Sequence, residues 1–253
     1  MRILVSNDDG INAQGLESLE RIARELSDDV WTVAPEADQS GMARSITLTR
    51  PLRIRKVGVQ RYAVDGTPTD CVQLGVAHLL KDNPPDLILS GINNGLNVAE
   101  DVTMSGTIAA AFQGMTIGVP SIALSQARKD RNKAPFHVAE AVVPDILRKL
   151  IKRGWDESVV ININVPFVDT PEEVKGVKLT RQGRRDHVEL FVEEREDMRQ
   201  RRYYWFGFSG KPSEPSPETD LHAIHTNHVS ITPLHLQLTD ERTIGLLEED
   251  FPA

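Results

Sequence analysis

Two adjacent carboxylates stand near the start of the chain, where a predicted strand ends. Residues 3–5 form an apolar run, Ile-Leu-Val, and Asn7, Asp8, Asp9 and Gly10 follow it. Neighbouring carboxylates repel one another and stay ionised at low cost only if a cation or strong hydrogen-bond donors face them. The pair is therefore a candidate ligand set for a hard divalent metal ion. A solvated Asp-Asp-Gly turn is the ordinary explanation of an isolated motif, because Asp and Gly are common turn residues.

Two more oxygen-bearing side chains follow predicted buried strands. Ser40 lies in the loop after a strand predicted at residues 30–34, and Asn93 follows a strand predicted at residues 87–89. The carboxyl ends of parallel strands meet at one edge of a sheet, where open α/β proteins bind ligands. Together with the acidic pair, these groups form an all-oxygen set that suits Mg²⁺, Mn²⁺ or Ca²⁺ and not zinc or copper. Chance placement of common loop residues is the competing explanation.

A third polar motif, Ser105-Gly106-Thr107, stands before an alanine-rich run at residues 108–112 that predicts a helix. A helix start presents free backbone N–H groups and the positive end of the helix dipole, which suits a phosphate group. Ordinary N-capping by Ser or Thr is the commoner explanation of such a motif on its own.

The elements that must position these groups alternate between strands and helices. Apolar runs and helical spacing predict strands at residues 3–5, 30–34, 87–89, 122–124 and 159–163, and helices at residues 16–26, 72–80, 108–112 and 138–151. Residues 44–64 alternate apolar and polar positions and predict antiparallel strands instead. The order indicates an α/β fold with a mostly parallel sheet that is complete by residue 163.

The last third of the chain changes in character. Residues 181–217 combine many charges of both signs with four successive aromatic residues and a loop rich in Ser and Pro, which indicates a projecting β-hairpin arm and loop. Mixed charge favours a solvated arm over a nucleic-acid patch. The aromatic residues, Tyr203 to Phe206, predict packing against another subunit. A strand at 229–232 and a helix at 241–247 follow, and the whole chain, 1–253, is expected to be one domain.

Composition excludes several classes of protein. A net charge of −8 opposes binding to nucleic acid or to an anionic membrane surface, and no apolar run approaches the roughly 18 residues of a membrane span. The single cysteine, Cys71, excludes an intrachain disulfide and is expected to be structural. No signal-peptide pattern precedes the first strand, so a cytoplasmic protein is expected.

Five motifs in the first half of the chain carry a family resemblance. They are Ser-Asn-Asp-Asp-Gly at residues 6–10, Val-Ala-Pro with Gln-Ser-Gly at 33–35 and 39–41, Gly-Thr-Pro-Thr-Asp-Cys at 66–71, Ser-Gly-Ile-Asn-Asn-Gly at 90–95 with Asn97, and Ser-Gly-Thr at 105–107. Looser matches occur at residues 163–166 and 229–239. In this order, the motifs resemble those of the stationary-phase survival protein SurE family.

The resemblance implies a metal-dependent phosphatase that releases phosphate from nucleoside 5′- and 3′-monophosphates. It implies a Rossmann-like three-layer domain whose C-terminal parts, including a tail at 228–253, mediate assembly into a homodimer or homotetramer. One divalent metal ion per subunit, Mg²⁺ or Mn²⁺, would be held by Asp8, Asp9, Ser40 and Asn93, of which the two Asp residues are also catalytic. The phosphate site would be lined by Asn97, Ser105, Gly106 and Thr107.

The sequence departs from the family pattern at three places outside these ligands. Met104 replaces an aromatic residue, Ala99-Glu100 replaces a glycine-containing turn, and Asn227-His228 replaces a Gly-Tyr pair. These changes bear on substrate range more than on chemistry. His235, the matched histidine of the tail, has either a structural role or a role in proton transfer.

Three other functions compete with the nucleotidase. A phosphoacceptor signalling domain needs an Asp after the third strand, where this chain has Asn93. A phosphatase that forms an aspartyl-phosphate usually has Asp-x-Asp spacing, whereas Asp8 and Asp9 are adjacent. A non-catalytic metal- and nucleotide-binding module remains open, because binding and turnover use the same metal ligands.

Overall fold

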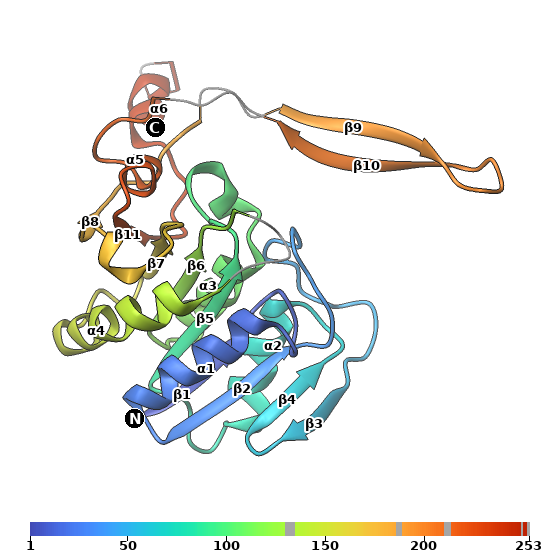
Figure 1. Ribbon diagram of the computed structural model, residues 1–253, viewed down its shortest axis with the longest axis vertical. Helices are drawn as coiled ribbons and strands as arrows, with labels where there is room; N and C mark the ends of the chain where they lie inside the picture. The colour runs from blue at the N-terminus through green and yellow to red at the C-terminus, as the bar shows by residue number, and fades with distance from the viewer. Residues whose placement is uncertain (130–134, 186–188, 210–213, 249, 252–253) are drawn as a thin grey trace.

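A nine-stranded sheet forms the centre of the molecule (Figure 1). The computed structural model describes residues 1–129, 135–185, 189–209, 214–248 and 250–251. In spatial order its strands are β3 (Ile54–Gly58), β4 (Arg61–Val64), β2 (Asp29–Pro35), β1 (Arg2–Ser6), β5 (Leu87–Asn94), β6 (Ser121–Gln126), β7 (Val160–Val165), β11 (Val229–Leu234) and β8 (Val177–Leu179). The pairs β3–β4 and β7–β11 are antiparallel, and the other neighbouring pairs are parallel. The predicted α/β fold with a mostly parallel sheet is confirmed.

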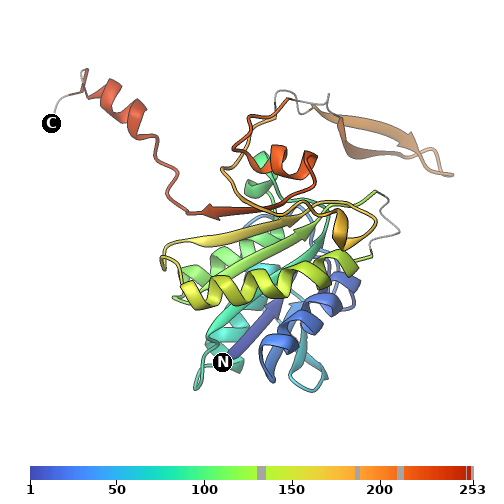
Figure 2. The same ribbon diagram turned by 60° about the vertical axis from the view of Figure 1, so that its left-hand side comes forward.

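Helices cover both faces of this sheet and complete three layers (Figures 1 and 2). The helices on the two faces are α1 (Gln14–Leu26), α2 (Pro68–Leu74), α3 (Gly106–Thr116) and α4 (His137–Arg153), and α5 (Asp220–His225) and α6 (Glu241–Leu247) follow towards the C-terminus. Successive side chains of a strand point to opposite faces of the sheet. In β1, Ile3 and Val5 therefore pack with α1 and α4, whereas Leu4 packs with α2 and α3. A strand covered on both faces needs an unbroken apolar run, which is the pattern at residues 3–5.

The capping chemistry of α2 agrees with its sequence. Thr67 accepts a hydrogen bond from the backbone N–H of Asp70, and the Asp70 carboxylate accepts one from the backbone N–H of Thr67. Such a reciprocal pair satisfies two backbone donors that a helix start leaves without partners. The helix continues into a π-helical turn over Gly75–Leu79. Cys71 is on the buried face of α2 and packs in the core, as expected for a structural residue.

Strand β5 is longer than predicted. The polar stretch after residue 89 continues the strand to Asn94, with a register shift between Ser90 and Asn93. Gly91 permits this irregularity, because its φ is +137° and a Cβ there would lie 2.2 Å from the carbonyl oxygen of Leu124. The sheet itself, and not a loop, therefore carries Asn93.

Two other predictions about the sheet were wrong. Residues 44–52 form no strand, and Leu48 in this stretch is 82% exposed, because an alternating pattern makes a strand only where a neighbour offers its backbone. The sheet also does not end at β7, because β11 and the three-residue β8 extend it after a long excursion of the chain. The helix predicted at 241–247 coincides with α6.

A hairpin and a C-terminal tail extend from the three layers in different directions (Figure 2). The hairpin consists of β9 (Glu189–Glu196) and β10 (Arg202–Ser209), which form a separate two-stranded antiparallel ribbon. Trp205 is 60% exposed and Phe206 is 71% exposed. Helix α6 of the tail has no buried residue. Among the described residues, no helix has the length and apolar character needed to cross a membrane.

Candidate metal and phosphate site

The two carboxylates of the opening motif lie just beyond the end of β1, at the edge where the neighbouring parallel strands also end. Asp8 is 3% exposed, and Asp9 is partly buried. Oδ2 of Asp9 accepts a 3.2 Å hydrogen bond from the backbone N–H of Asn94 on β5. The adjacent strand therefore restrains the Asp9 carboxylate.

Burial makes the charged form of this pair costly. The pKa of Asp8 is raised from 3.8 to about 6, mainly because burial removes water from the carboxylate and secondly because Asp9 repels it. A hydrogen bond donated by the Thr107 hydroxyl to Oδ1 opposes this rise. Burial also raises the pKa of Asp9, against the backbone N–H of Asn94 and the charge of Arg128. A cation between the carboxylates would reverse both shifts, because an opposite charge favours the ionised form.

Helix α3 begins directly against Asp8. Ser105 is its N-cap, and the Ser105 Oγ accepts a 3.1 Å hydrogen bond from the backbone N–H of Ile108. Gly106 permits the close approach, because a Cβ at this position would lie 2.7 Å from the Cβ of Asp8. Thr107 is fully buried behind the Asp8 carboxylate. The approach brings the positive end of the helix dipole to the acidic pair.

Ser40 and Asn93 lie on the wall of the same cavity as the two carboxylates. Ser40 donates hydrogen bonds to Oδ1 of Asp38 from its backbone N–H, at 2.8 Å, and from its hydroxyl, at 2.6 Å. Its Oγ oxygen keeps lone pairs that could face a cation. The side-chain nitrogen of Asn93 donates to the carbonyl of Gly95 at 2.9 Å, so the amide oxygen of Asn93 is the atom that could face a cation.

Asn97 is fixed by a buried polar network that the sequence reasoning missed. Its side-chain nitrogen donates to Ser125 Oγ, its backbone N–H donates to Oδ1 of Asn164, and its carbonyl accepts from the side chains of Asn162 and Asn164, all at 2.8–3.1 Å. Ser125, Asn162 and Asn164 are all fully buried on β6 and β7. Polar residues within an otherwise apolar buried strand are the signal that could have revealed them, because buried polar groups require partners.

One cavity of about 570 Å³, the acidic cavity, contains these groups at the carboxyl edge of the sheet. Its wall is formed by Asp8, Asp9, Asp38, Ser40, Gly41, Asn93, Asn94, Gly95, Leu96, Asn97, Asp101, Met104, Ser105 and Arg128. Six of the eight predicted site residues are in this set, whereas Gly106 and Thr107 lie beneath Asp8. Among the described lining residues, Arg128 is the one cation beside four carboxylates. It follows the end of β6 by two residues, so the strand-end rule that located Ser40 and Asn93 also applies to it.

The donor set fits a hard divalent cation. Two ionisable carboxylates, a hydroxyl oxygen and an amide oxygen are the ligands that Mg²⁺ and Mn²⁺ accept. Within the described ranges, no group of three or more His, Cys, Asp or Glu side chains is placed to hold a metal. A cation in this cavity would therefore depend on the acidic pair for its charged ligands.

His235 lies elsewhere. It lines a separate cavity of about 610 Å³ where β11 ends, together with Leu179, Thr180 and Arg181. It is exposed and is absent from the wall of the acidic cavity. The geometry thus favours a role for His235 outside the reaction.

Comparisons with known proteins agree with the sequence motifs. The family described as survival protein SurE matches residues 3–189. A protein named 5′-nucleotidase SurE from Parvibaculum lavamentivorans is 55% identical over 251 residues, covering 98% of this chain and 90% of the relative. Another of that name from Caulobacter vibrioides (strain NA1000 / CB15N) is 51% identical, with 98% and 95% covered. The crystal structure of the SurE protein from Aquifex aeolicus superposes with a TM-score of 0.83 at 37% identity, covering 99% of this chain and 100% of that one.

Proposed function

The chain belongs to the survival protein SurE family, and we propose that it is a metal-dependent 5′-nucleotidase that also accepts 3′-monophosphates. The proposed reaction is hydrolysis of a phosphate monoester to a nucleoside and inorganic phosphate. The relatives that share half of its residues along nearly the whole chain are named for the 5′ activity. This favours a hydrolase over a non-catalytic binding module.

The observation that carries the proposal is the junction of the acidic pair with the start of α3. Asp8 lies against Gly106, and Ser105 lines the same cavity as both carboxylates. A cation ligand set thus adjoins a helix start that can bind phosphate oxygens. At about 570 Å³, the cavity is within the range that holds small ligands.

Each polar group receives a proposed role. Asp8, Asp9, Ser40 and Asn93 would hold one Mg²⁺ or Mn²⁺ ion. When bound, that ion would supply Lewis-acid assistance and activate water for attack on phosphorus. Ser105 and the first-turn N–H groups of Gly106 and Thr107 would orient the phosphate oxygens, with Asn97 beside them. Arg128 would supply a positive charge to the phosphate group of the substrate, because the other charged residues on the described wall are acidic.

Three further statements belong to the same proposal. The substrates are free nucleoside monophosphates and not nucleic acid, in keeping with the net charge of −8. The working location is the cytoplasm. The active form is a homodimer or homotetramer, for which the exposed aromatic side chains of β10 offer a contact surface.

Phosphate release from a panel of nucleoside 5′- and 3′-monophosphates tests the proposal. The enzyme is first treated with EDTA and then assayed with Mg²⁺, with Mn²⁺ or without added metal. We expect phosphate release only with metal. A chain that binds these nucleotides in the presence of metal but releases no phosphate would instead be a binding module.

A further inference from the structure

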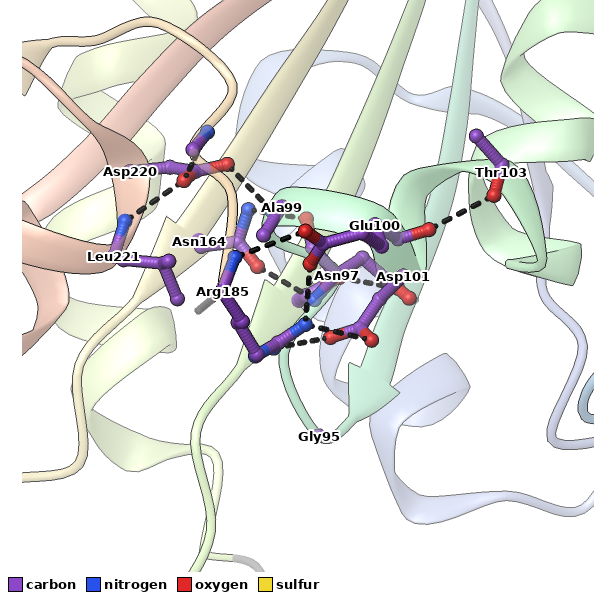
Figure 3. Close-up of polar contacts among 12 residues, drawn as sticks. Gly95, Asn97, Ala99, Glu100, Asp101, Thr103, Asn164, Arg185, Asp220 and Leu221 are labelled. Atoms are coloured by element: carbon purple, nitrogen blue, oxygen red, sulfur yellow. Dashed lines mark hydrogen bonds and ion pairs between the residues drawn. The ribbon is translucent and has the colours of Figure 1, made fainter. Parts of the chain in front are cut away.

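Residues from the last third of the chain hold the segment between Asn97 and Ser105, two proposed phosphate-site residues (Figure 3). Residues Ala99–Thr103 of this segment form a 3₁₀ turn, and Asp101 lines the acidic cavity. The contacts come from residues 182–185, which precede β9 and form the root of the hairpin arm, and from the start of α5. The residues joined by these hydrogen bonds are more than 80 positions apart in sequence.

The backbone of Ala99, the first residue of this turn, has a φ of +52°. This left-handed conformation is uncommon for a residue with a Cβ. The carboxylate of Asp220 accepts the backbone N–H of Ala99 at 3.0 Å, and the Gln182 side chain donates to the Ala99 carbonyl at 2.9 Å. Asp220 also accepts the backbone N–H of Gly183 at 2.9 Å. One buried carboxylate thus joins the turn to the root of the arm.

Arg185 faces the two acidic residues of this turn. Its guanidinium makes a bidentate pair with Asp101, with Nη1 to Oδ1 at 3.0 Å and Nη2 to Oδ2 at 2.6 Å. Its backbone N–H donates to Oε1 of Glu100 at 2.9 Å, and Nη1 reaches Oε2 of Glu100 at 3.4 Å. Figure 3 shows the guanidinium pointing at the Asp101 carboxylate. Arg185 itself is not part of the described cavity wall.

This pairing changes the charge that a substrate meets. The described cavity wall carries four carboxylates, Asp8, Asp9, Asp38 and Asp101, against the one cation Arg128, and a bound metal ion would offset only the charge near the first two. A phosphate monoester is a dianion near neutral pH. An unpaired Asp101 would repel it at short range.

We propose that Arg185 is a positioning residue for the nucleotidase. It holds Asp101 in an ion pair and so removes a negative charge that would oppose entry of the phosphate group. The inference rests on the proposed function. It adds a residue at the root of the arm, outside the site motifs, that sets the affinity of the site for phosphate.

The experiment measures kcat and KM for a nucleoside 5′-monophosphate at fixed Mg²⁺ in four variants: Arg185→Gln, Arg185→Lys, Asp101→Asn and the double variant Arg185→Gln with Asp101→Asn. Arg185→Gln should raise KM about tenfold and change kcat less than about twofold, and added KCl should shrink the rise. Arg185→Lys should keep most of the affinity, because it keeps the charge. The double variant should return KM close to the parent value, because it also removes the charge of Asp101. If Arg185→Gln raised KM through a structural defect, Asp101→Asn would not correct it.

Arg184→Gln is the matched control, because it makes the same charge change at the adjacent residue, which is exposed. It should leave KM unchanged. A parent-like KM for Arg185→Gln, or a raised KM that Asp101→Asn does not correct, would overturn the role of Arg185. If Arg185→Gln does not fold, a KM for Arg185→Lys that exceeds the parent value tenfold would do the same.

If the proposed function is wrong, the parent protein releases no phosphate, and this result is distinct from an effect of Arg185. Calorimetric binding of inorganic phosphate in the presence of Mg²⁺ then replaces KM. The dissociation constant should follow the same order among the variants, because the repulsion acts on bound phosphate whether or not it is released. Equal dissociation constants for the parent and for Arg185→Gln would refute the inference.

Discussion

Asp9 is the less buried member of the acidic pair, and its removal tests the metal site most directly. Asp9→Asn takes one negative charge from the proposed cation, so the protein should fold but lose turnover about a hundredfold or more at ordinary Mg²⁺ or Mn²⁺. Its melting temperature should also rise less on addition of metal, because a metal ion that binds more weakly stabilises the protein less at a given concentration. Turnover and melting temperature are measured across a metal titration.

Asp28→Asn is the control for this experiment, since Asp28 is exposed and precedes the amino end of β2, away from the cavity. It should behave like the parent protein. Parent-like turnover of Asp9→Asn, or a parent enzyme that is indifferent to EDTA, would show that the acidic pair is only a turn.

Asp8 gives the metal-free protein a pH dependence with a definite sign. Because its pKa is raised to about 6, the folded state binds the proton more tightly than the unfolded state does. Ionisation of Asp8 therefore costs stability progressively as the pH rises from about 4 to about 6, by up to about 3 kcal/mol. In EDTA, Asp8→Asn should melt at a higher temperature than the parent at pH 8, with little difference at pH 4. Equal melting temperatures at pH 8 would contradict the shift.

At the scale of elements, the site depends on how closely the start of α3 approaches Asp8, just after β1. Gly106→Ala places a Cβ 2.7 Å from the Cβ of Asp8, so the helix and the segment after β1 must move apart. We expect the melting temperature to fall by about 2 to 10 °C, as for an overpacked core, and turnover to fall with it. Thermal unfolding and phosphate release measure both effects.

Gly245→Ala makes the same substitution in α6, where an added Cβ meets nothing within 4 Å. It should leave turnover unchanged and keep or slightly raise the melting temperature, because Ala favours a helix by about 1 kcal/mol over Gly. If both glycine variants kept parent-like turnover and stability, the close approach of α3 would have no functional importance.

At the scale of the whole molecule, apolar side chains are exposed at two places outside the three layers. Tyr204, Trp205 and Phe206 are 55–71% exposed on the hairpin arm, and Leu246 is 61% exposed on α6. Exposed apolar surfaces of this kind favour burial against another copy of the same chain. Light scattering at micromolar concentration should give a mass of at least twice 28.1 kDa.

The arm's part in this assembly has its own variant. Replacement of both Trp205 and Phe206 by Ser should lower the mass seen by light scattering, because it removes much of the apolar surface of the arm. Val59→Ser is the control, since Val59 is 89% exposed in the tight turn between β3 and β4. A mass near 28.1 kDa for the unmodified protein would refute the oligomer.

Local chemistry allowed the sequence by itself to determine the alternation of strands and helices, the acidic pair after β1, the Ser105 cap and the helix at 241–247. Apolar periodicity and capping act between residues a few positions apart, so they can be read along the chain. Tertiary structure decided the rest. Ser125, Asn162 and Asn164 meet Asn97, and Arg185 meets Asp101, across 28 to 84 positions. The path of the chain over the sheet makes these contacts, and no local pattern encodes such pairs, just as none marks the three-residue β8 that exists only because β11 lies beside it.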